Sequence, residues 1–249
     1  MKIEYRQTKE PGLVQITTLD ERWYYREADE KLFPSVTWIS GYYPKGIEFY
    51  KWLASKGWDE AESIKTSAGD RGSRVHRAIE KLLGDGVLKM DDQFPIGDGH
   101  EFAELTVDEY ECAMSFHAWY METKPEILAI ETPVYNEEEG YAGTMDLKVK
   151  IGEEVFLVDL KTSQHIWPEH RIQVSAYLHT PQGKADKVAI LQVGYRKNKK
   201  LYKFTEVEDV YDLFLSAKKI WWAENEGVSP RQKDYPVQLT IPTITIAGA

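Results

Sequence analysis

The stretch AGTMDLKVKIGEEVFLVDLK, residues 142–161, decides the fold of this chain. Apolar and polar residues alternate on both sides of a glycine-containing turn, which predicts a hairpin of two strands, 142–151 and 154–161. Side chains two apart on a strand share a face, so Asp159 and Lys161 lie on the same side of the second strand. The apolar residues between and before them then point into the core.

The neighbouring segments extend this hairpin into a larger sheet with helices. A strand over 127–135 precedes it, and strands over 186–195 and 200–205 follow it. Apolar residues at helical spacing predict helices over 45–56, 71–84, 107–123, 169–180 and 206–225. We expect a strand or hairpin over 13–27 and a loop over 91–106. This order predicts an α/β protein whose mixed central sheet is flanked by helices on both faces.

The whole chain has 249 residues, of which 42% are hydrophobic and 29% are charged, as is typical of a globular protein. We expect an N-terminal helical extension over 1–60, a core over 61–226 and a C-terminal tail over 227–249. The tail either adds an edge strand or is mobile. No apolar run reaches the ~18 residues of a membrane span, and the charged N-terminus is unlike a signal peptide. We therefore expect a soluble, cytoplasmic protein that has no membrane partner.

Charge is distributed unevenly along the sequence. The net charge of −10 argues against a general nucleic-acid coat protein. Residues 89–140 hold fourteen acidic residues and two lysines, whereas residues 159–203 hold nine basic and three acidic residues. The second stretch can bind a polyanion, although alternating solvated faces explain the same pattern. The single Cys112 excludes a disulfide framework and an all-cysteine iron–sulfur cluster within one chain.

Asp146, Asp159 and Lys161 are the clearest candidates for chemistry. The predicted hairpin brings the two carboxylates close together, and a Mg²⁺ or Mn²⁺ ion would offset their repulsion. Such a metal lowers the pKa of its bound water toward ~7, and Lys161 can orient that water or stabilise developing negative charge. These residues fit metal-assisted phosphodiester hydrolysis. The alternative is a structural Asp–Lys pair in a central strand.

Several motifs in a fixed order give the sequence a family resemblance. It resembles the RecB-type exonuclease branch of the PD-(D/E)XK nuclease superfamily through Arg71-Gly72-Ser73-Arg74-Val75-His76, Gly143-Thr144-Met145-Asp146, Val158-Asp159-Leu160-Lys161-Thr162 and Gln173-Val174-Ser175-Ala176-Tyr177. Phe33-Pro34-Ser35-Val36-Thr37 resembles a segment of phage exonucleases and of the mitochondrial genome maintenance exonuclease. The resemblance covers about residues 33–195 and implies a restriction-endonuclease-like core. Met145 departs from the proline in the superfamily's name.

The resemblance also implies roles for individual residues. Asp146, Asp159 and the carbonyl oxygen of Leu160 would be metal ligands, and Lys161 would be the catalytic lysine. His76 would be a further ligand, which favours Mn²⁺ because imidazole is a poor ligand for Mg²⁺. The cysteines that hold an iron–sulfur cluster in some relatives are absent from this sequence, so we expect no such cluster.

Four residues are predicted to contact the substrate. Gln173 and Tyr177 lie four apart and share a face of their predicted helix, where the resemblance implies that they place the substrate backbone. Arg74 lies among basic residues around His76 and can contact phosphates, although a solvated surface arginine is an equal alternative. Trp167 follows the second strand of the hairpin and is the best candidate to stack on a base.

Two glutamates are candidates for supporting the metal ligands. Glu131, in the strand over 127–135, either supports a metal ligand or binds a second metal ion, or it is a sheet-edge or surface residue. Glu80 lies one helical turn after His76, so it either orients the imidazole or is an ordinary exposed glutamate. We expect the remaining histidines to be surface or packing residues: His100, His117, His165, His170 and His179.

The resemblance implies a Mg²⁺- or Mn²⁺-dependent deoxyribonuclease. We expect an exonuclease that acts on single-stranded DNA or on processed DNA ends in replication, recombination or repair, and we expect a phage or prophage source. Three alternatives remain open: an endonuclease with the same site, a catalytically inert nucleic-acid-binding module, and cleavage of RNA by the same chemistry.

Overall fold

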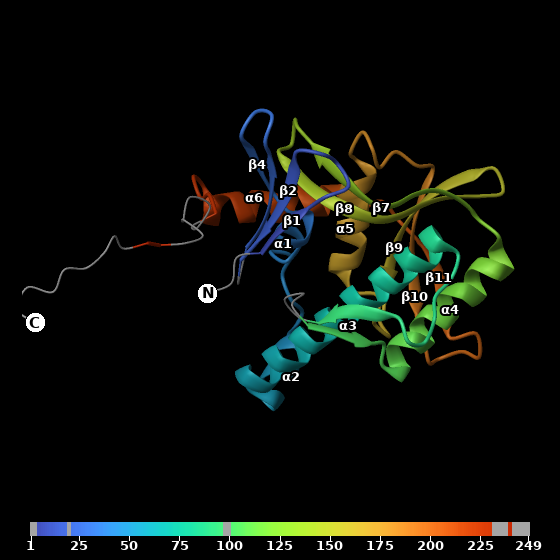
Figure 1. The fold of residues 1–249 in the computed structure, drawn as a ribbon. Helices are drawn as coiled ribbons and strands as arrows, with labels where there is room; N and C mark the ends of the chain where they lie inside the picture. Colours follow the sequence, from blue (N-terminus) through green and yellow to red (C-terminus); the bar gives the residue numbers. More distant parts are fainter. Residues whose placement is uncertain (1–3, 19–20, 97–100, 231–238, 241–249) are drawn as a thin grey trace, which may run out of the picture.

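The structure is a computed structural model that describes residues 4–18, 21–96, 101–230 and 239–240. The chain is a mixed α/β protein with a five-stranded sheet, a four-stranded sheet and a two-stranded hairpin (Figure 1). The strands are β1 (Glu4–Gln7), β2 (Leu13–Thr17), β3 (Arg22–Arg26), β4 (Lys31–Pro34), β5 (Gln93–Ile96), β6 (Glu101–Glu104), β7 (Glu126–Asn136), β8 (Tyr141–Ile151), β9 (Glu154–Lys161), β10 (Lys187–Val193) and β11 (Tyr202–Val207). The helices are α1 (Val36–Ser40), α2 (Ile47–Lys56), α3 (Trp58–Asp85), α4 (Val107–Thr123), α5 (Pro168–Leu178) and α6 (Tyr211–Asn225).

The five-stranded sheet has the strand order β11-β10-β9-β8-β7. Strands β9 and β10 are parallel and the other neighbours are antiparallel, so the sheet is mixed. The predicted hairpin is confirmed as β8 and β9. Gly152 in its turn has a φ of 63°, a left-handed conformation that glycine adopts without steric cost. Helix α5 lies in the crossover that the parallel pair requires.

Helices cover both faces of this sheet, as the sequence predicted (Figure 1). On one face, Val158 and Leu160 of β9 belong to a core cluster with Val75 of α3 and Phe116 of α4. On the other face, Leu157 packs in a second cluster with residues of α1, α5 and α6. The alternation along β9 therefore follows the period of two that the sequence indicated.

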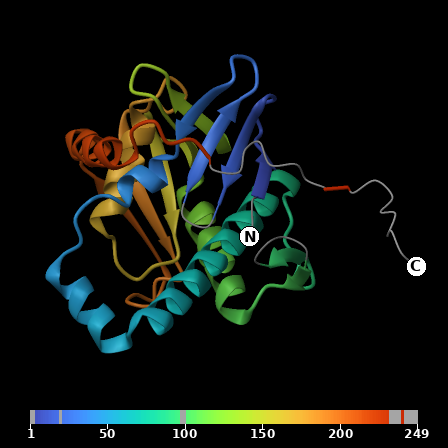
Figure 2. The same ribbon diagram turned by 90° about the vertical axis from the view of Figure 1, so that its left-hand side faces the viewer.

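The expected helical extension over residues 1–60 is wrong for most of its length. Strands β1 to β4 form an antiparallel meander, which Figure 2 shows beside the five-stranded sheet. Alternation explains these strands, because Val14, Ile16 and Trp23 enter the core while Gln15 and Arg22 do not. Contacts of β3 and β4 with β8 join the two sheets.

Helix α3 begins at Trp58, well before the predicted start at residue 71. The expected domain boundary after residue 60 therefore falls inside a helix. Before Arg74, only Ala61 is buried, so this part of the helix lacks the apolar stripe by which a helix is recognised. Figure 2 shows α2 and the start of α3 projecting beyond the sheets.

The segment over 91–106, which was predicted to be a loop, is a second difference between prediction and structure. It contains the β5–β6 hairpin, in which Phe94 is buried. One short strand with a single buried aromatic gives too few alternating residues for recognition from sequence.

The C-terminal part follows the prediction as far as α6, although β11 takes the two residues at which the helix was expected to begin. The expected edge strand or mobile tail over 227–249 falls mostly outside the described residues. In the described part of the chain, every helix is too short or too polar to cross a membrane.

Candidate metal centre

Three side chains that could bind a metal converge between α3 and the edge of the five-stranded sheet. One ligand atom each from His76, Glu131 and Asp146 lies within 4.8 Å of the others. His76 Nδ1 is 3.3 Å from Glu131 Oε1 and 3.4 Å from Asp146 Oδ1. His76 Nε2 is 3.1 Å from the carbonyl oxygen of Leu160. The structure thus brings together three of the four predicted ligand positions and adds Glu131.

The backbone of β7 is distorted where it presents Glu131. This residue has a φ of 44°, a left-handed conformation that is unfavourable for a residue with a Cβ. Its neighbours Ile130 and Thr132 pair with Leu147 and Met145, which places Glu131 opposite Asp146. A strained conformation of this kind costs about 1–3 kcal/mol and is concentrated at functional sites. The distortion supports the metal-site interpretation of Glu131 over that of an ordinary surface residue.

Asp146 is oriented by the strand that follows it. The backbone N–H of Leu160 donates a hydrogen bond of 2.7 Å to Asp146 Oδ2. The other carboxylate oxygen then faces His76. The β8–β9 hairpin therefore fixes the direction of this carboxylate, which a metal site requires.

Asp159 and Lys161 form the second half of the site. Lys161 Nζ lies 2.6 Å from Asp159 Oδ2, and the Asp159 side chain is only 2% exposed. Neither carboxylate oxygen of Asp159 accepts a hydrogen bond of ordinary geometry among the described residues. Asp159 also lies outside the compact group formed by His76, Glu131 and Asp146. A buried carboxylate left with so few partners is costly to the fold, and a cation beside it would remove that cost.

The charges of the site shift the pKa of each group. Burial opposes the charged form of His76, but Asp146 and Glu131 outweigh it and raise the His76 pKa well above its usual value. Burial also acts against the charge of Asp146, yet His76 and Lys161 hold the Asp146 pKa below its usual value. For Asp159, burial prevails over the attraction of Lys161 and raises the pKa. Three carboxylates therefore share two cationic neighbours.

These donors fit a divalent cation. Carboxylate and carbonyl oxygens suit Mg²⁺ and Mn²⁺, and one imidazole shifts the preference toward Mn²⁺. Asp159 is paired with Lys161 but accepts no hydrogen bond of ordinary geometry among the described residues, which agrees with a site that the protein atoms alone do not complete. His76, Glu131 and Asp146 would hold the ion, with Asp159 next to them, while the Leu160 carbonyl lies at the other ring nitrogen of His76.

The candidate metal centre opens into a cleft of about 620 Å³. Residues of α3, of the N-terminal sheet and of α5 line this cleft. Gln173 and Tyr177 are among them, as predicted, and Gln173 Nε2 donates a hydrogen bond of 2.8 Å to the Tyr177 hydroxyl. Trp167 is exposed at the N-cap of α5 and is not one of the cleft residues.

Arg74 does not face the cleft, so its predicted contact with phosphates is wrong. Its side chain is 7% exposed and forms an ion pair of 3.0 Å with Glu109 of α4. Its remaining N–H groups donate to carbonyl oxygens of the β5–β6 hairpin, including those of Phe94 and Glu104. Arg74 therefore joins α3, α4 and this hairpin. Arg71 and Arg77, on the same helix, do line the cleft.

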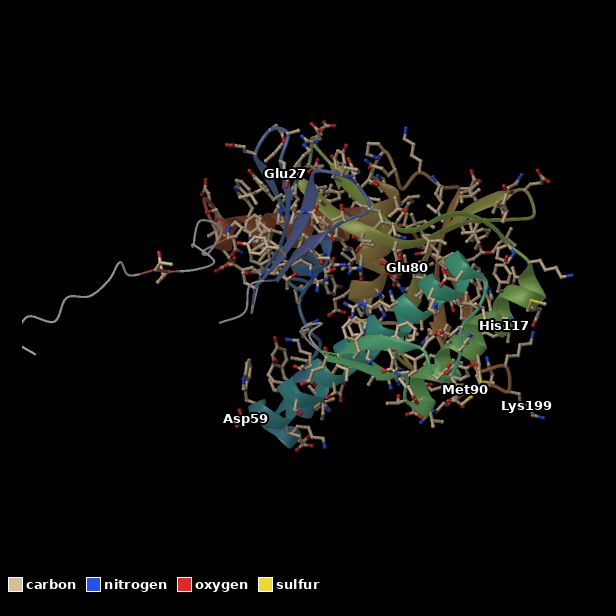
Figure 3. All side chains as sticks on the ribbon, viewed as in Figure 1. Glu27, Asp59, Glu80, Met90, His117 and Lys199 are labelled. Atoms are coloured by element: carbon tan, nitrogen blue, oxygen red, sulfur yellow. The ribbon has the colours of Figure 1, made fainter. Side chains whose placement is uncertain are left out.

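Glu80 does not orient His76. Its carboxylate, labelled in Figure 3, is 2.6 Å from Lys9 Nζ in an ion pair between α3 and the segment after β1. The partners of His76 Nδ1 are Glu131 and Asp146 instead. Glu80 therefore connects α3 to the N-terminal sheet and does not support a metal ligand.

His170 is a cleft residue that the sequence assigned to the surface or to packing. The backbone N–H of Trp167 donates to its Nδ1 at 3.3 Å, so a neutral ring carries its proton on Nε2. Burial, with a contribution from Lys161, lowers the pKa of His170 to about 3 and keeps the ring uncharged near neutral pH. The sequence signal that could have found it is its position at N3 of α5, because a side chain there often accepts a hydrogen bond from the backbone N–H of the N-cap residue.

The sequence also missed the part of the cleft that the N-terminal sheet supplies. Tyr24 is buried, and its hydroxyl lies 3.0 Å from Thr144 Oγ1, two residues before Asp146. Arg6 and Arg22 of the same sheet line the cleft. These residues lie far along the chain from the other motifs, so no local sequence pattern links them to the site.

No protein-family model matches this chain. No curated protein matches it either. The functional conclusion therefore depends on the residues of the site and on the sequence motifs.

Proposed function

We propose that this chain is a Mg²⁺- or Mn²⁺-dependent deoxyribonuclease with a restriction-endonuclease-like core of the RecB type. One observation carries the proposal: His76, Glu131 and Asp146 meet beside the Asp159–Lys161 pair at a cleft. A structural Asp–Lys pair would not need a histidine and two further carboxylates around it. The proposed substrate is single-stranded DNA or a processed DNA end.

The metal would supply Lewis-acid stabilisation and activate water for attack on phosphorus. His76, Glu131 and Asp146 would hold it, and Asp159 would balance its charge. Lys161 lines the cleft with 19% of its side chain exposed, and its ammonium group would stabilise a developing phosphoryl charge. Burial opposes the charge of Lys161, but Asp159 and Asp146 raise its pKa, so the lysine acts as a cation and not as a base.

The cleft favours a polyanion despite the overall charge of −10. Cations of α3 and of the N-terminal sheet line it, including Arg71, Arg77, Arg6 and Arg22. Gln173 and Tyr177 offer uncharged hydrogen-bonding groups next to them. The lysines of the segment between β10 and β11 are not among the cleft residues, and Lys200 forms an ion pair with Glu122. Phosphate binding is therefore proposed for α3 and the N-terminal sheet.

Cleavage of end-labelled linear single-stranded DNA tests the proposal. The wild-type protein should shorten the strand in Mg²⁺ or Mn²⁺ and should be inactive in EDTA. Lys161→Ala should lose activity at temperatures where circular dichroism shows it folded, although it should unfold at a lower temperature than the wild type because Asp159 loses its cation. Lys187→Ala is a matched control, because this lysine lies on the neighbouring strand β10 in a surface ion pair.

A covalently closed single-stranded circle and an RNA strand separate the alternatives. A circle that is spared supports an exonuclease that needs an end, whereas a circle that is cut makes the protein an endonuclease. Absence of cleavage of any strand with either metal would refute the proposal and favour an inert binding module. A role in replication, recombination or repair, and a phage source, remain proposals that follow from the family resemblance.

A further inference from the structure

We propose that the N-terminal sheet is a substrate-binding wall, in which Arg6 and Arg22 bind backbone phosphates of the DNA strand that occupies the cleft. This inference rests on the proposed function and adds to it a second binding surface, outside the motifs that resemble the nuclease family. Four observations support it: the register of the strands, the anchoring of the sheet, the pairing of its cations and the charge of the opposite wall.

The strand register places the relevant side chains on one face. Arg6 of β1 pairs with Gln15 of β2, and Gln15 pairs with Tyr24 of β3. Arg22 lies two residues before Tyr24 and therefore shares its face. All four residues line the cleft that contains the candidate metal centre. The side chains on the other face of these strands, among them Val14, Ile16 and Trp23, belong to the core.

Tyr24 anchors this face to the site. Its hydroxyl accepts a hydrogen bond of 2.8 Å from Gln15 Nε2 and lies 3.0 Å from Thr144 Oγ1 of β8. Burial raises the pKa of Tyr24, and the charges of Arg22 and Arg6 oppose that rise, which agrees with their position around the hydroxyl. The two guanidinium groups are thus held by a sheet that is bonded to the strand carrying Asp146.

Some basic side chains of the N-terminal segment have acidic partners and others do not. Arg26 is held by Asp29 and Glu137, and Lys9 is held by Glu80. The side chains of Arg6 and Arg22 have no ion-pair or hydrogen-bond partner among the described residues, although the protein has an excess of acidic groups. Both side chains are exposed. An anion that enters the cleft would find these two charges uncompensated.

The geometry indicates contact with two different phosphates. Arg6 and Arg22 lie two strands apart, which is about 10 Å across the sheet, and are offset along the strands by about 7 Å. Arg71 and Arg77 approach the same cleft from α3. A strand bound between the two walls would have phosphates on both sides and its reactive phosphate at the metal centre.

Salt dependence of binding provides the test, because each phosphate contact releases counterions. Full-length Lys161→Ala protein, in which hydrolysis is removed, would be titrated into fluorescein-labelled oligothymidylate in Mg²⁺ between about 50 and about 200 mM NaCl. Adding Arg6→Gln and Arg22→Gln should weaken binding about tenfold or more and make the log–log salt slope shallower by about 1.4. The matched control is Lys31→Gln with Lys219→Gln, which removes the same charge from β4 and α6, outside the cleft.

The outcomes are distinct. A shallower slope in the arginine variant alone, with an unchanged unfolding temperature, supports the proposal. Equal slopes and affinities in the arginine and lysine variants overturn it while leaving the proposed function intact, provided that the wild-type protein cuts DNA. If the protein with Lys161 intact cuts no strand and the Lys161→Ala protein binds none, the proposed function fails and this inference fails with it.

Discussion

Gly143 of β8 and Tyr177 of α5 are in such close contact that any side chain at position 143 would force the tyrosine ring to move. A Cβ atom on Gly143 would lie 2.4 Å from Tyr177 Cε1. Tyr177 is buried, and its hydroxyl accepts the hydrogen bond from Gln173 in the cleft. The glycine that lies three residues before Asp146 therefore determines where the ring of α5 sits, and so connects two of the sequence motifs physically.

Replacing this glycine should displace Tyr177 and lower both stability and activity. We expect Gly143→Ala to reduce the free energy of unfolding by about 1–3 kcal/mol, because the added methyl group overpacks a rigid contact. Chemical denaturation and DNA cleavage measure the two effects. Gly143→Ala combined with Tyr177→Leu should recover part of the stability, since the ring that clashes is gone. If the single variant is as stable as the wild type, the contact is less rigid than the structure indicates.

Arg74 should be important for stability and not for DNA binding. Its guanidinium group is buried against Glu109, so Arg74→Met leaves an unpaired carboxylate and should cost about 3–5 kcal/mol. Arg74→Met with Glu109→Gln should be more stable than the single variant, and glutamine at position 109 also keeps an acceptor for the α4 N-cap. Folded Arg74→Met protein should keep the salt slope of the wild type. A shallower slope would restore Arg74 as a phosphate contact.

The five-stranded sheet was predicted more accurately from the sequence than the elements around it. The β7–β8–β9 segment has long alternating runs around a tight turn, which leave one choice of register and face. The hairpin expected over 13–27 is confirmed as β2 and β3. Strands β1 and β4 are only four residues long, and the first half of α3 has almost no buried face, so these elements carried no strong periodic signal.

Site residues that belong to a sequence motif could be predicted. Site residues whose position depends on tertiary contacts could not. Asp146 and Lys161 follow from strand alternation. Arg74 looked like its neighbours Arg71 and Arg77, and only the docking of the β5–β6 hairpin shows that it is buried. Arg6 joins the site because the sheet in which it pairs with Gln15 contacts β8, which lies far along the chain. Such a relationship is a property of the fold and not of any local stretch.

Asp159 should be destabilising in the metal-free protein. Its folded-state pKa is raised, so the folded state binds more protons than the unfolded state above pH ~4, and stability falls as the pH rises through the folded pKa. Asp159→Asn removes this penalty, and we expect the variant to be more stable than the wild type by about 1–3 kcal/mol near pH 7 in EDTA, with little difference near pH 4. Urea denaturation at both pH values measures this. Mg²⁺ or Mn²⁺ should stabilise the wild type more than the variant, and a variant that is less stable at pH 7 would contradict this account.

Metal binding should release a proton from His76. Without metal, Asp146 and Glu131 raise the pKa of this imidazole well above its usual value, so the ring is protonated near neutral pH and donates toward Glu131 and Leu160. A metal ligand must be the neutral ring, so the ion competes with the proton and its affinity should rise by up to tenfold per pH unit below that pKa. Calorimetric titration with Mn²⁺ in two buffers of different ionisation enthalpy gives the number of protons released. His76→Gln keeps a polar side chain that does not titrate, so it should bind Mn²⁺ more weakly and release fewer protons. Equal proton release by the two proteins would show that His76 is not a ligand and that its ion pairs with Glu131 and Asp146 persist when metal is bound.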